Sequence, residues 1–374
     1  MSTAMPAAAP AIKTQAGITI LELMVSLALG LLIMVGLTSV FATSSQAHRE
    51  FHRTSQQIEN GRYAMDVLTH DLHHAGYYGQ HYRITPAAAA PDPCALNDVG
   101  GAITQSLGYA VQGYDAPDWA TRPDLTATSC GAWLTAANLV AGSDVLVVRR
   151  AETVALAPAT VALANDVYLQ ANPEQVEIQF GGGAAVGTTY KADGALATIK
   201  ARDGVAAAEI RKFRVHVYFV APCSVPAGGG DVCTGAGDDS GQPIPTLKRL
   251  ELGSNGGATA MRVLPIAEGI ESLQVDYGVD DSPAAVNSMT GSMGDGSPDR
   301  YVRAPTAPEA TNIVSARLHV LSRSSEATGG HTDTKTYVLG IAGATGPFND
   351  AFKRHAYAGV VRAVNPSARR EIPK

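Results

Sequence analysis

The sequence of 374 residues has few charged and few aromatic side chains. Charged residues make up 17% and aromatic residues 6%, whereas 45% are hydrophobic, and the mean hydropathy is +0.02. This composition is typical of a folded protein and excludes a disordered chain or a multi-span membrane protein. The formal net charge is −6, so the overall charge gives no argument for a nucleic-acid-binding protein.

The sequence contains one long hydrophobic run and no internal repeat. From Ile18 to Ala42 the residues are apolar or small except for Glu22. A helix of about 20 such residues crosses a hydrocarbon core of roughly 30 Å, so we expect one membrane span at about residues 18–42. A cleaved secretory signal has an apolar core of only about 7–15 residues. An uncleaved single-span anchor is the simplest alternative.

Glu22 is the isolated charge of this run. A carboxylate costs roughly 3 kcal/mol at the centre of a bilayer and less near its surface, and the N-terminal end of a helix favours a negative group. If the chain were cut after Gly17, Ile18 would carry a positive amine four residues away, on the same helix face. The amine and the carboxylate could then neutralise each other, within one subunit or between neighbours.

The segment GITILELMV, residues 17–25, resembles the prepilin cleavage and methylation motif of type IV pilins and type II secretion pseudopilins. The resemblance implies cleavage between Gly17 and Ile18 by a prepilin peptidase/methylase, which removes a cytoplasmic leader of residues 1–17. It also implies N-methylation of Ile18 and the role of assembly carboxylate for Glu22.

The helical pattern continues beyond the hydrophobic run. Phe51, Ile58, Met65 and Leu72 recur every seven residues, and Leu68 and Ala75 fill the same stripe, which is predicted to pack against a folded head. Gly76 is a plausible C-terminal stop. We therefore expect one long helix over residues 18–76, followed by a head over residues 77–374.

The head is predicted to be rich in β-strands, which gives the chain an α+β fold class. The 38 glycines and 21 prolines indicate many turns. Residues 265–270 are interpreted as a short helix or turn, and the stretches rich in glycine, alanine or proline as loops (84–93, 181–208 and 222–245). Strands are expected over residues 144–150, 175–180, 209–220, 246–252, 272–279, 313–323, 336–339 and 355–361.

The four cysteines indicate an oxidising compartment and loops held by disulfides. Cys223 and Cys233 bracket a loop rich in glycine and are expected to pair with each other. Cys94 and Cys130 then pair by elimination. A zinc site is the alternative, although these spacings do not resemble one.

Familiar catalytic signatures are absent from the sequence, so we expect a protein that is not an enzyme and has no small-molecule substrate. The acidic residues Asp280, Asp281, Asp295 and Asp299 lie in one stretch rich in glycine and serine, where carboxylates can hold Ca²⁺. Their spacing is not that of an EF-hand. A solvated loop without a metal or cofactor is therefore the favoured interpretation.

Four further stretches resemble minor pilins of the PilW type: HHAGYYG (73–79), AEGIESLQVDYGVDD (267–281), NIVSARLHVLSRS (312–324) and RHAYAGVVRAVNPSARR (354–370). The resemblance implies a minor pilin that assembles and primes a type IV pilus, with links to twitching motility and cell adhesion. Implied partners are other minor and major pilins, the prepilin peptidase/methylase and the inner-membrane assembly platform.

The precursor is expected in the bacterial inner membrane, with its N-terminus in the cytoplasm and its head in the periplasm, before it reaches the pilus and cell surface. A large head favours the filament tip, where no subunit stacks above it. Two alternatives remain. A type II secretion minor pseudopilin shares the same N-terminal features, and a pilus-tip adhesin or DNA-uptake subunit would bind a ligand through residues 85–245.

Overall fold

The computed structural model describes seven segments of the chain: residues 17–84, 88–96, 103–156, 166–180, 199–255, 258–282 and 294–371. The predicted leader, apart from Gly17, lies outside these residues, as does most of the predicted loop over 181–208. Contacts between residues divide the chain into two units, Met1–His52 and Arg53–Lys374.

The long helix α1 begins at Ile20 and ends at His73. The predicted helix over residues 18–76 is present, but it begins two residues later and ends three residues earlier than predicted. The chain then turns at Gly76, where φ is +70°, a backbone conformation that glycine adopts without strain. In the first unit, residues 17–44 are exposed without exception.

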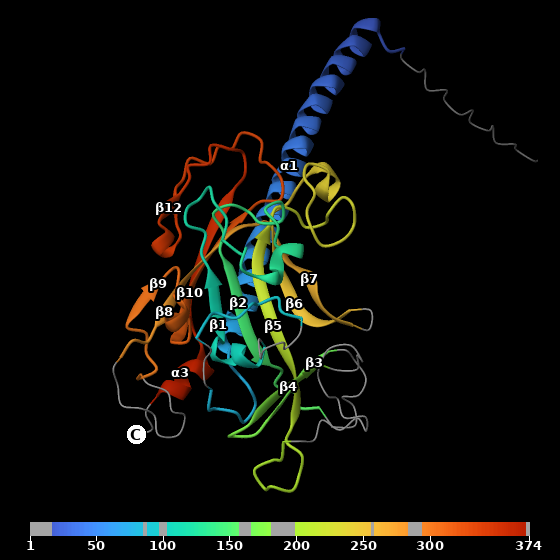
Figure 1. Ribbon diagram of the computed structural model, residues 1–374. Helices are drawn as coiled ribbons and strands as arrows, with labels where there is room; N and C mark the ends of the chain where they lie inside the picture. Colours follow the sequence, from blue (N-terminus) through green and yellow to red (C-terminus); the bar gives the residue numbers. More distant parts are fainter. Residues whose placement is uncertain are drawn as a thin grey trace, which may run out of the picture. The chain divides into compact units, whose positions relative to one another are not determined.

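The second unit, the head, contains a sheet of seven described strands, all paired antiparallel (Figure 1). Its main path runs in the order β1 (Val111–Tyr114), β2 (Val145–Ala151), β5 (Ile210–Ala221), β3 (Val167–Ala171) and β4 (Val176–Phe180). β6 (Thr246–Asn255) pairs with β5 and with β7 (Ala258–Glu268). Val217 of β5 is opposite Val147 of β2 and opposite Leu250 of β6, so β2 and β6 flank β5.

A second sheet has the order β13 (Arg354–Arg362), β10 (Ile313–Arg323), β8 (Ile270–Val279) and β9 (Arg300–Val302), again antiparallel. β11 (Tyr337–Val338) and β12 (Ala344–Thr345) form a short ribbon. The remaining described elements are the helices α2 (Ala307–Ala310) and α3 (Val364–Arg370) and the 3₁₀ turns η2 (Thr104–Gly108), η3 (Ser129–Ala132), η5 (Asp238–Gly241) and η6 (Gly340–Ala342). The β-rich head and the long helix confirm the predicted α+β class.

The eight predicted strands are all present, but the interpretation of residues 265–270 was wrong. β7 continues to Glu268, and Gly269 alone makes the turn, with φ at +72°. Pro265 indicated a break in the strand. Proline is nevertheless tolerated in edge strands and at bulges, and the pairing of β6 with β7 shifts register between Leu247 and Lys248, the residue opposite Pro265. β1, β3, β7, β9 and β12 were not predicted.

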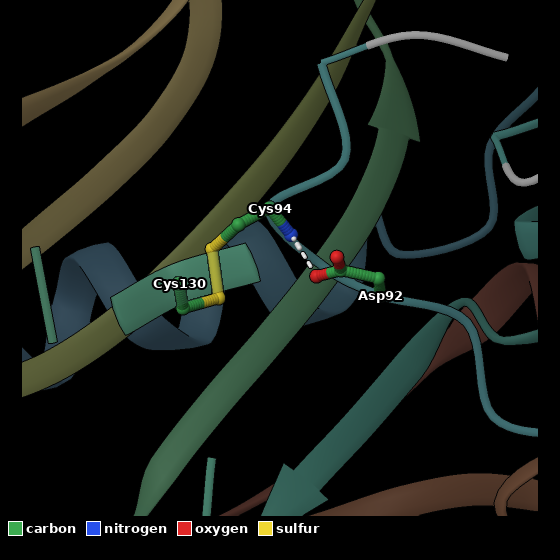
Figure 2. Close-up of side chains that lie close together, drawn as sticks. All are labelled: Asp92, Cys94 and Cys130. Atoms are coloured by element: carbon green, nitrogen blue, oxygen red, sulfur yellow. Dashed lines mark hydrogen bonds between the residues drawn. A yellow bond between two sulfur atoms is a disulfide. The ribbon is translucent and has the colours of Figure 1, made fainter. Parts of the chain in front are cut away.

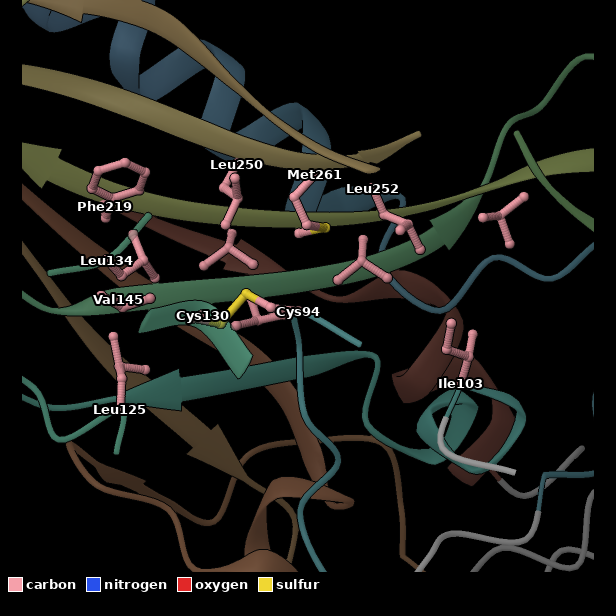
Figure 3. Close-up of a cluster of buried hydrophobic side chains, with 14 of the residues drawn as sticks. Cys94, Ile103, Leu125, Cys130, Leu134, Val145, Phe219, Leu250, Leu252 and Met261 are labelled. Atoms are coloured by element: carbon pink, nitrogen blue, oxygen red, sulfur yellow. A yellow bond between two sulfur atoms is a disulfide. The ribbon is translucent and has the colours of Figure 1, made fainter. Parts of the chain in front are cut away.

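The seven-stranded sheet is buried on both faces. On β2, Val145 and Val147 belong to one hydrophobic core, whereas Leu146 and Val148 belong to another. Successive side chains of a strand point to opposite faces, which is why β2 reads as continuously apolar. The first core also contains both disulfides, and Figure 3 shows Cys94 and Cys130 within it. The second core includes side chains from the C-terminal part of α1.

The C-terminal part of the predicted stripe is buried, but its N-terminal part is not. Leu68, Leu72 and Ala75 are fully buried, whereas Phe51 is 71% exposed and Ile58 37% exposed. The face that packs on the head is made by Gln57, Gly61, Ala64, Leu68, Asp71 and Leu72. Gly61 belongs there because a Cβ atom would come within 2.2 Å of the Tyr357 ring. Gln57 donates hydrogen bonds to backbone carbonyls of Ser322 and Lys353, which compensates for its burial.

Candidate functional site

The predicted processing segment lies at the start of α1. Gly17, Ile18 and Thr19 precede the helix, which begins at Ile20. The amide of Glu22 donates to the hydroxyl of Thr19 at 3.3 Å, and the amide of Leu23 donates to the carbonyl of Thr19 at 3.1 Å. Thr19 is therefore the N-cap of α1. Glu22 occupies the third helical position, where the helix dipole stabilises a negative carboxylate.

The side chains beyond Thr19 are apolar and exposed. Ile20 is 80% exposed and Leu32 is 70% exposed. A window of this helix has a mean hydropathy of 2.5, and none of it is buried by the rest of the chain. By length and composition, α1 is the one described helix that could cross a membrane. An apolar surface this long is compatible with membrane anchoring.

The four acidic residues of the predicted calcium site are held by hydrogen bonds from the chain itself. Asp280 is buried, and its carboxylate accepts from the guanidinium of Arg370 at 2.9 Å and from the amide of Gly296 at 2.9 Å. Burial opposes ionisation of Asp280, but these donors hold its pKa below the usual value. Asp280 therefore anchors α3. The sequence predicted a solvated loop here, but Asp280 is buried.

The other three carboxylates have donors of their own. Asp281 pairs with Arg300 at 2.5 Å, Asp299 accepts from the amide of Asp281 at 2.7 Å, and Asp295 accepts from the amide of Ser297 at 2.8 Å. Among the described residues, the groups of side chains close enough to share a metal ion lie elsewhere. The geometry favours a structural loop over a calcium site.

The two groups of potential metal ligands each contain a disulfide. Cys94 bonds to Cys130 and Cys223 to Cys233, as the sequence predicted. Asp92 lies beside the first pair, where its carboxylate accepts from the amide of Cys94 at 2.9 Å (Figure 2). Asp238 lies beside the second. A cysteine binds a metal ion as a thiolate, and all four sulfurs are bonded in pairs, so the cysteines of these two groups cannot bind a metal ion in this state.

Sequence reasoning missed a buried charge network between α1 and β5. Asp71 is 2% exposed. Its carboxylate contacts Nε of Arg150 at 2.6 Å and Nδ1 of His216 at 2.7 Å, and accepts from the hydroxyl of Tyr218 at 3.0 Å. Burial raises the pKa of Asp71, but His216 and Arg150 more than offset this and hold it well below the usual value. The weak signal in the sequence was the polar face of β5, on which His216 and Tyr218 alternate with valines.

The family model of PilW, the type IV pilus-assembly protein W, matches residues 233–365. Residues 233–365 are therefore similar to that family. The resemblance noted from the sequence is thereby confirmed, and it supports a part for this chain in type IV pilus assembly. The region covers β6 to β13 and includes the acidic loop, whereas the N-terminal segment lies outside it.

A search among curated proteins gave no match. Among solved structures, a type IV-like pilin from Thermus thermophilus is similar at 12% sequence identity, over 83% of this chain and 96% of that chain, with a TM-score of 0.29. A likeness of this size carries no argument about the function of this chain.

Proposed function

We propose that this PilW-type chain is a minor pilin that takes part in assembling and priming a type IV pilus, without catalysis, at the tip of the filament. The observation that carries the proposal is the N-terminal segment: an exposed apolar helix that begins shortly after Gly17 and has Glu22 in its first turn. The PilW match in the head supports the pilus as its destination.

The proposed mechanism is a change of surroundings for the first part of α1. The precursor lies in the inner membrane, with its N-terminus in the cytoplasm and its head in the periplasm. Cleavage after Gly17 creates an amine on Ile18, which the prepilin peptidase/methylase then methylates. Glu22 pairs with such an amine on a neighbouring pilin, and the apolar side chains leave lipid for a bundle of helices.

The proposed partners come from this mechanism: minor and major pilins in the filament, and the inner-membrane platform that extracts the subunit. The tip is proposed because the head unit is large, running from Arg53 to Lys374. A subunit of this size at the tip needs no room above it. Through the filament, the protein would serve twitching motility or cell adhesion.

The test measures processing and incorporation in cells. With wild-type protein, mass spectrometry should find a mature chain that begins at Ile18, and Gly17→Ala should retain the first seventeen residues. Glu22→Ala should be processed and inserted but should be lost from sheared pili. Ser26→Ala, one helical turn further along on the exposed helix, is the matched control and should co-purify normally.

Thr19→Val separates pairing from capping. It removes the hydroxyl that accepts from the amide of Glu22 but leaves the carboxylate in place. If Thr19→Val were lost from pili as completely as Glu22→Ala, Glu22 would act through the helix start and the pairing role would be wrong. A strain without the gene that keeps its pili but loses protein secretion would instead assign the chain to a type II secretion system.

A further inference from the structure

We propose that Cys223–Cys233 is the thiol-exchange site of the head. Lys248 stabilises its reduced form as a thiolate, so a dithiol reductant opens this disulfide before Cys94–Cys130. The inference concerns the chemistry of the head and does not depend on the proposed role in the pilus.

Lys248 is the only buried lysine among the described residues, with 2% of it exposed. It lies on β6 opposite Phe219 of β5, on the strand face that carries Leu250 and the first hydrophobic core. Its ammonium nitrogen is 3.9 Å from the sulfur of Cys223 and 3.8 Å from the sulfur of Cys233. Within the part of the chain that the structure describes, Lys248 forms no ion pair with a carboxylate.

The surroundings of Lys248 disfavour an unpaired cation. Burial lowers the pKa of Lys248, and the carboxylates of Asp239, Asp238 and Asp231 oppose this only partly. Asp238 and Asp239 are themselves occupied: Asp238 accepts from the amides of Ala227, Thr234 and Gly235, and Asp239 from those of Ser224, Val225 and Ile244. These hydrogen bonds hold the loop. The ammonium nitrogen contacts the two disulfide sulfurs, and the carboxylate of Asp238 lies beside the same sulfurs.

Reduction gives that cation a partner. A dithiol transfers two electrons to the protein disulfide: its own sulfurs join, the bond between Cys223 and Cys233 breaks, and two protons are released for the two protein sulfurs. One protein sulfur takes a proton and becomes a thiol. The other remains a thiolate beside the ammonium of Lys248, and its proton goes to solvent. A nearby cation lowers the pKa of a cysteine and favours the reduced state.

Each disulfide has a carboxylate beside it, Asp238 at Cys223–Cys233 and Asp92 at Cys94–Cys130, but among the described residues only the sulfurs of Cys223–Cys233 contact a lysine. Asp92 lies beside Cys94–Cys130, with both carboxylate oxygens hydrogen-bonded to backbone amides of Cys94 and Ser129 (Figure 2). A negative group raises the pKa of a nearby thiol, so reduction there yields two thiols and no thiolate. The chain thus contains its own control.

The test equilibrates the full-length protein, in detergent, with oxidised and reduced dithiothreitol at pH 7. Acid quenching, differential alkylation and mass spectrometry then give the reduced fraction of each cysteine pair. Lys248→Met should require at least a tenfold higher ratio of reduced to oxidised dithiothreitol to open Cys223–Cys233, which corresponds to about 30 mV. Lys248→Arg should retain the wild-type midpoint, and neither variant should move that of Cys94–Cys130.

A second readout needs no variant. Reduced dithiothreitol and a pair of protein thiols each hold two protons, so reduction of Cys94–Cys130 releases no net proton. The ratio of reduced to oxidised dithiothreitol that reduces half of Cys94–Cys130 should therefore not change between pH 6 and 8. Because reduction of Cys223–Cys233 releases one proton, its midpoint should move roughly tenfold per pH unit. An unchanged midpoint in Lys248→Met, a midpoint of Cys223–Cys233 that is independent of pH, or earlier reduction of Cys94–Cys130 would each overturn the proposal.

Discussion

The two halves of α1 differ in which side chains the fold of the chain buries. In the first half, leucines and isoleucines are exposed, as at Leu32 with 70%. In the second half, a carboxylate and an amide, Asp71 and Gln57, are buried together with Leu68 and Leu72. Hydrophobicity alone would predict neither the exposed leucines nor the two buried polar side chains. The difference shows that burial in the second half is decided by partners on the sheets, whereas the first half has an apolar surface that the chain's own fold leaves uncovered.

Asp71→Ala should have the largest effect on the stability of the head, lowering the free energy of unfolding by about 3–5 kcal/mol. The reason is that the partly buried Arg150 would lose its counter-charge, and the buried side chains of His216 and Tyr218 would lose their hydrogen-bond partner. Denaturant unfolding of the full-length chain in detergent, followed by the fluorescence of Trp119 and Trp133, measures it. Asp66→Ala, on the exposed face of the same helix, should change stability by less than about 0.5 kcal/mol.

The same variant should lose its effect at low pH. The pKa of Asp71 is lowered in the folded state, so its contribution is complete above its ordinary value of 3.8 and is lost as the pH falls towards the folded-state value. The stability gap between wild type and Asp71→Ala should therefore narrow below pH 4. A gap that is constant down to pH 2 would contradict the ion-pair explanation.

Leu68→Ala and Leu32→Ala compare one substitution in the two halves. Leu68 is fully buried in the second core, so the change should cost about 2–5 kcal/mol. Leu32→Ala should leave the unfolding of the head within about 0.5 kcal/mol of wild type. If both substitutions lowered the free energy of unfolding by similar amounts, the contrast between the two halves of α1 would be wrong, because the first half would then contribute to the stability of the head.

Gly61→Ala should destabilise the head by about 1–2 kcal/mol. Its methyl group would meet the Tyr357 ring, and such overpacking costs about 1–3 kcal/mol, from which the better helix propensity of alanine subtracts up to about 1 kcal/mol. In a Tyr357→Ala background the clash disappears, and Gly61→Ala should become neutral or stabilising. A double-mutant cycle in urea gives the coupling, and additive effects would exclude the contact.

Patterns among residues close to one another in the sequence predicted most of the fold. The hydrophobic run and its continuation predicted α1, and alternation predicted strands such as β10 with its correct bounds. The sequence of β3, VYLQA, is short and was not predicted as a strand, and neither was β7, which contains Pro265. The loop of 222–245 and its disulfide were predicted because Cys223 and Cys233 are close in sequence.

The polar contacts were out of reach because their partners are distant in sequence. Asp71 and His216 are 145 positions apart, and nothing near Asp71 indicates that it is buried. Lys248 resembles any lysine on a strand until the disulfide is placed beside it. The heptad count was misleading at Phe51 because it recorded hydrophobicity, and the buried face of the helix is selected by the close approach of Tyr357 and by hydrogen-bonding partners.

The last elements of the chain close on the end of α1. The side-chain amide of Asn365 donates a hydrogen bond to the backbone carbonyl of Ala75, which is 290 positions away in the sequence. The guanidinium of Arg369 donates to the backbone carbonyl of Gly76. Contacts between residues so distant in sequence form slowly, because closing the long loop between them costs conformational entropy before the contact can stabilise the chain. On the ribosome, α1 would emerge early and wait for the C-terminal residues to be translated. A prematurely terminated product would keep that helix face bare, which makes it a ready target for proteolytic quality control.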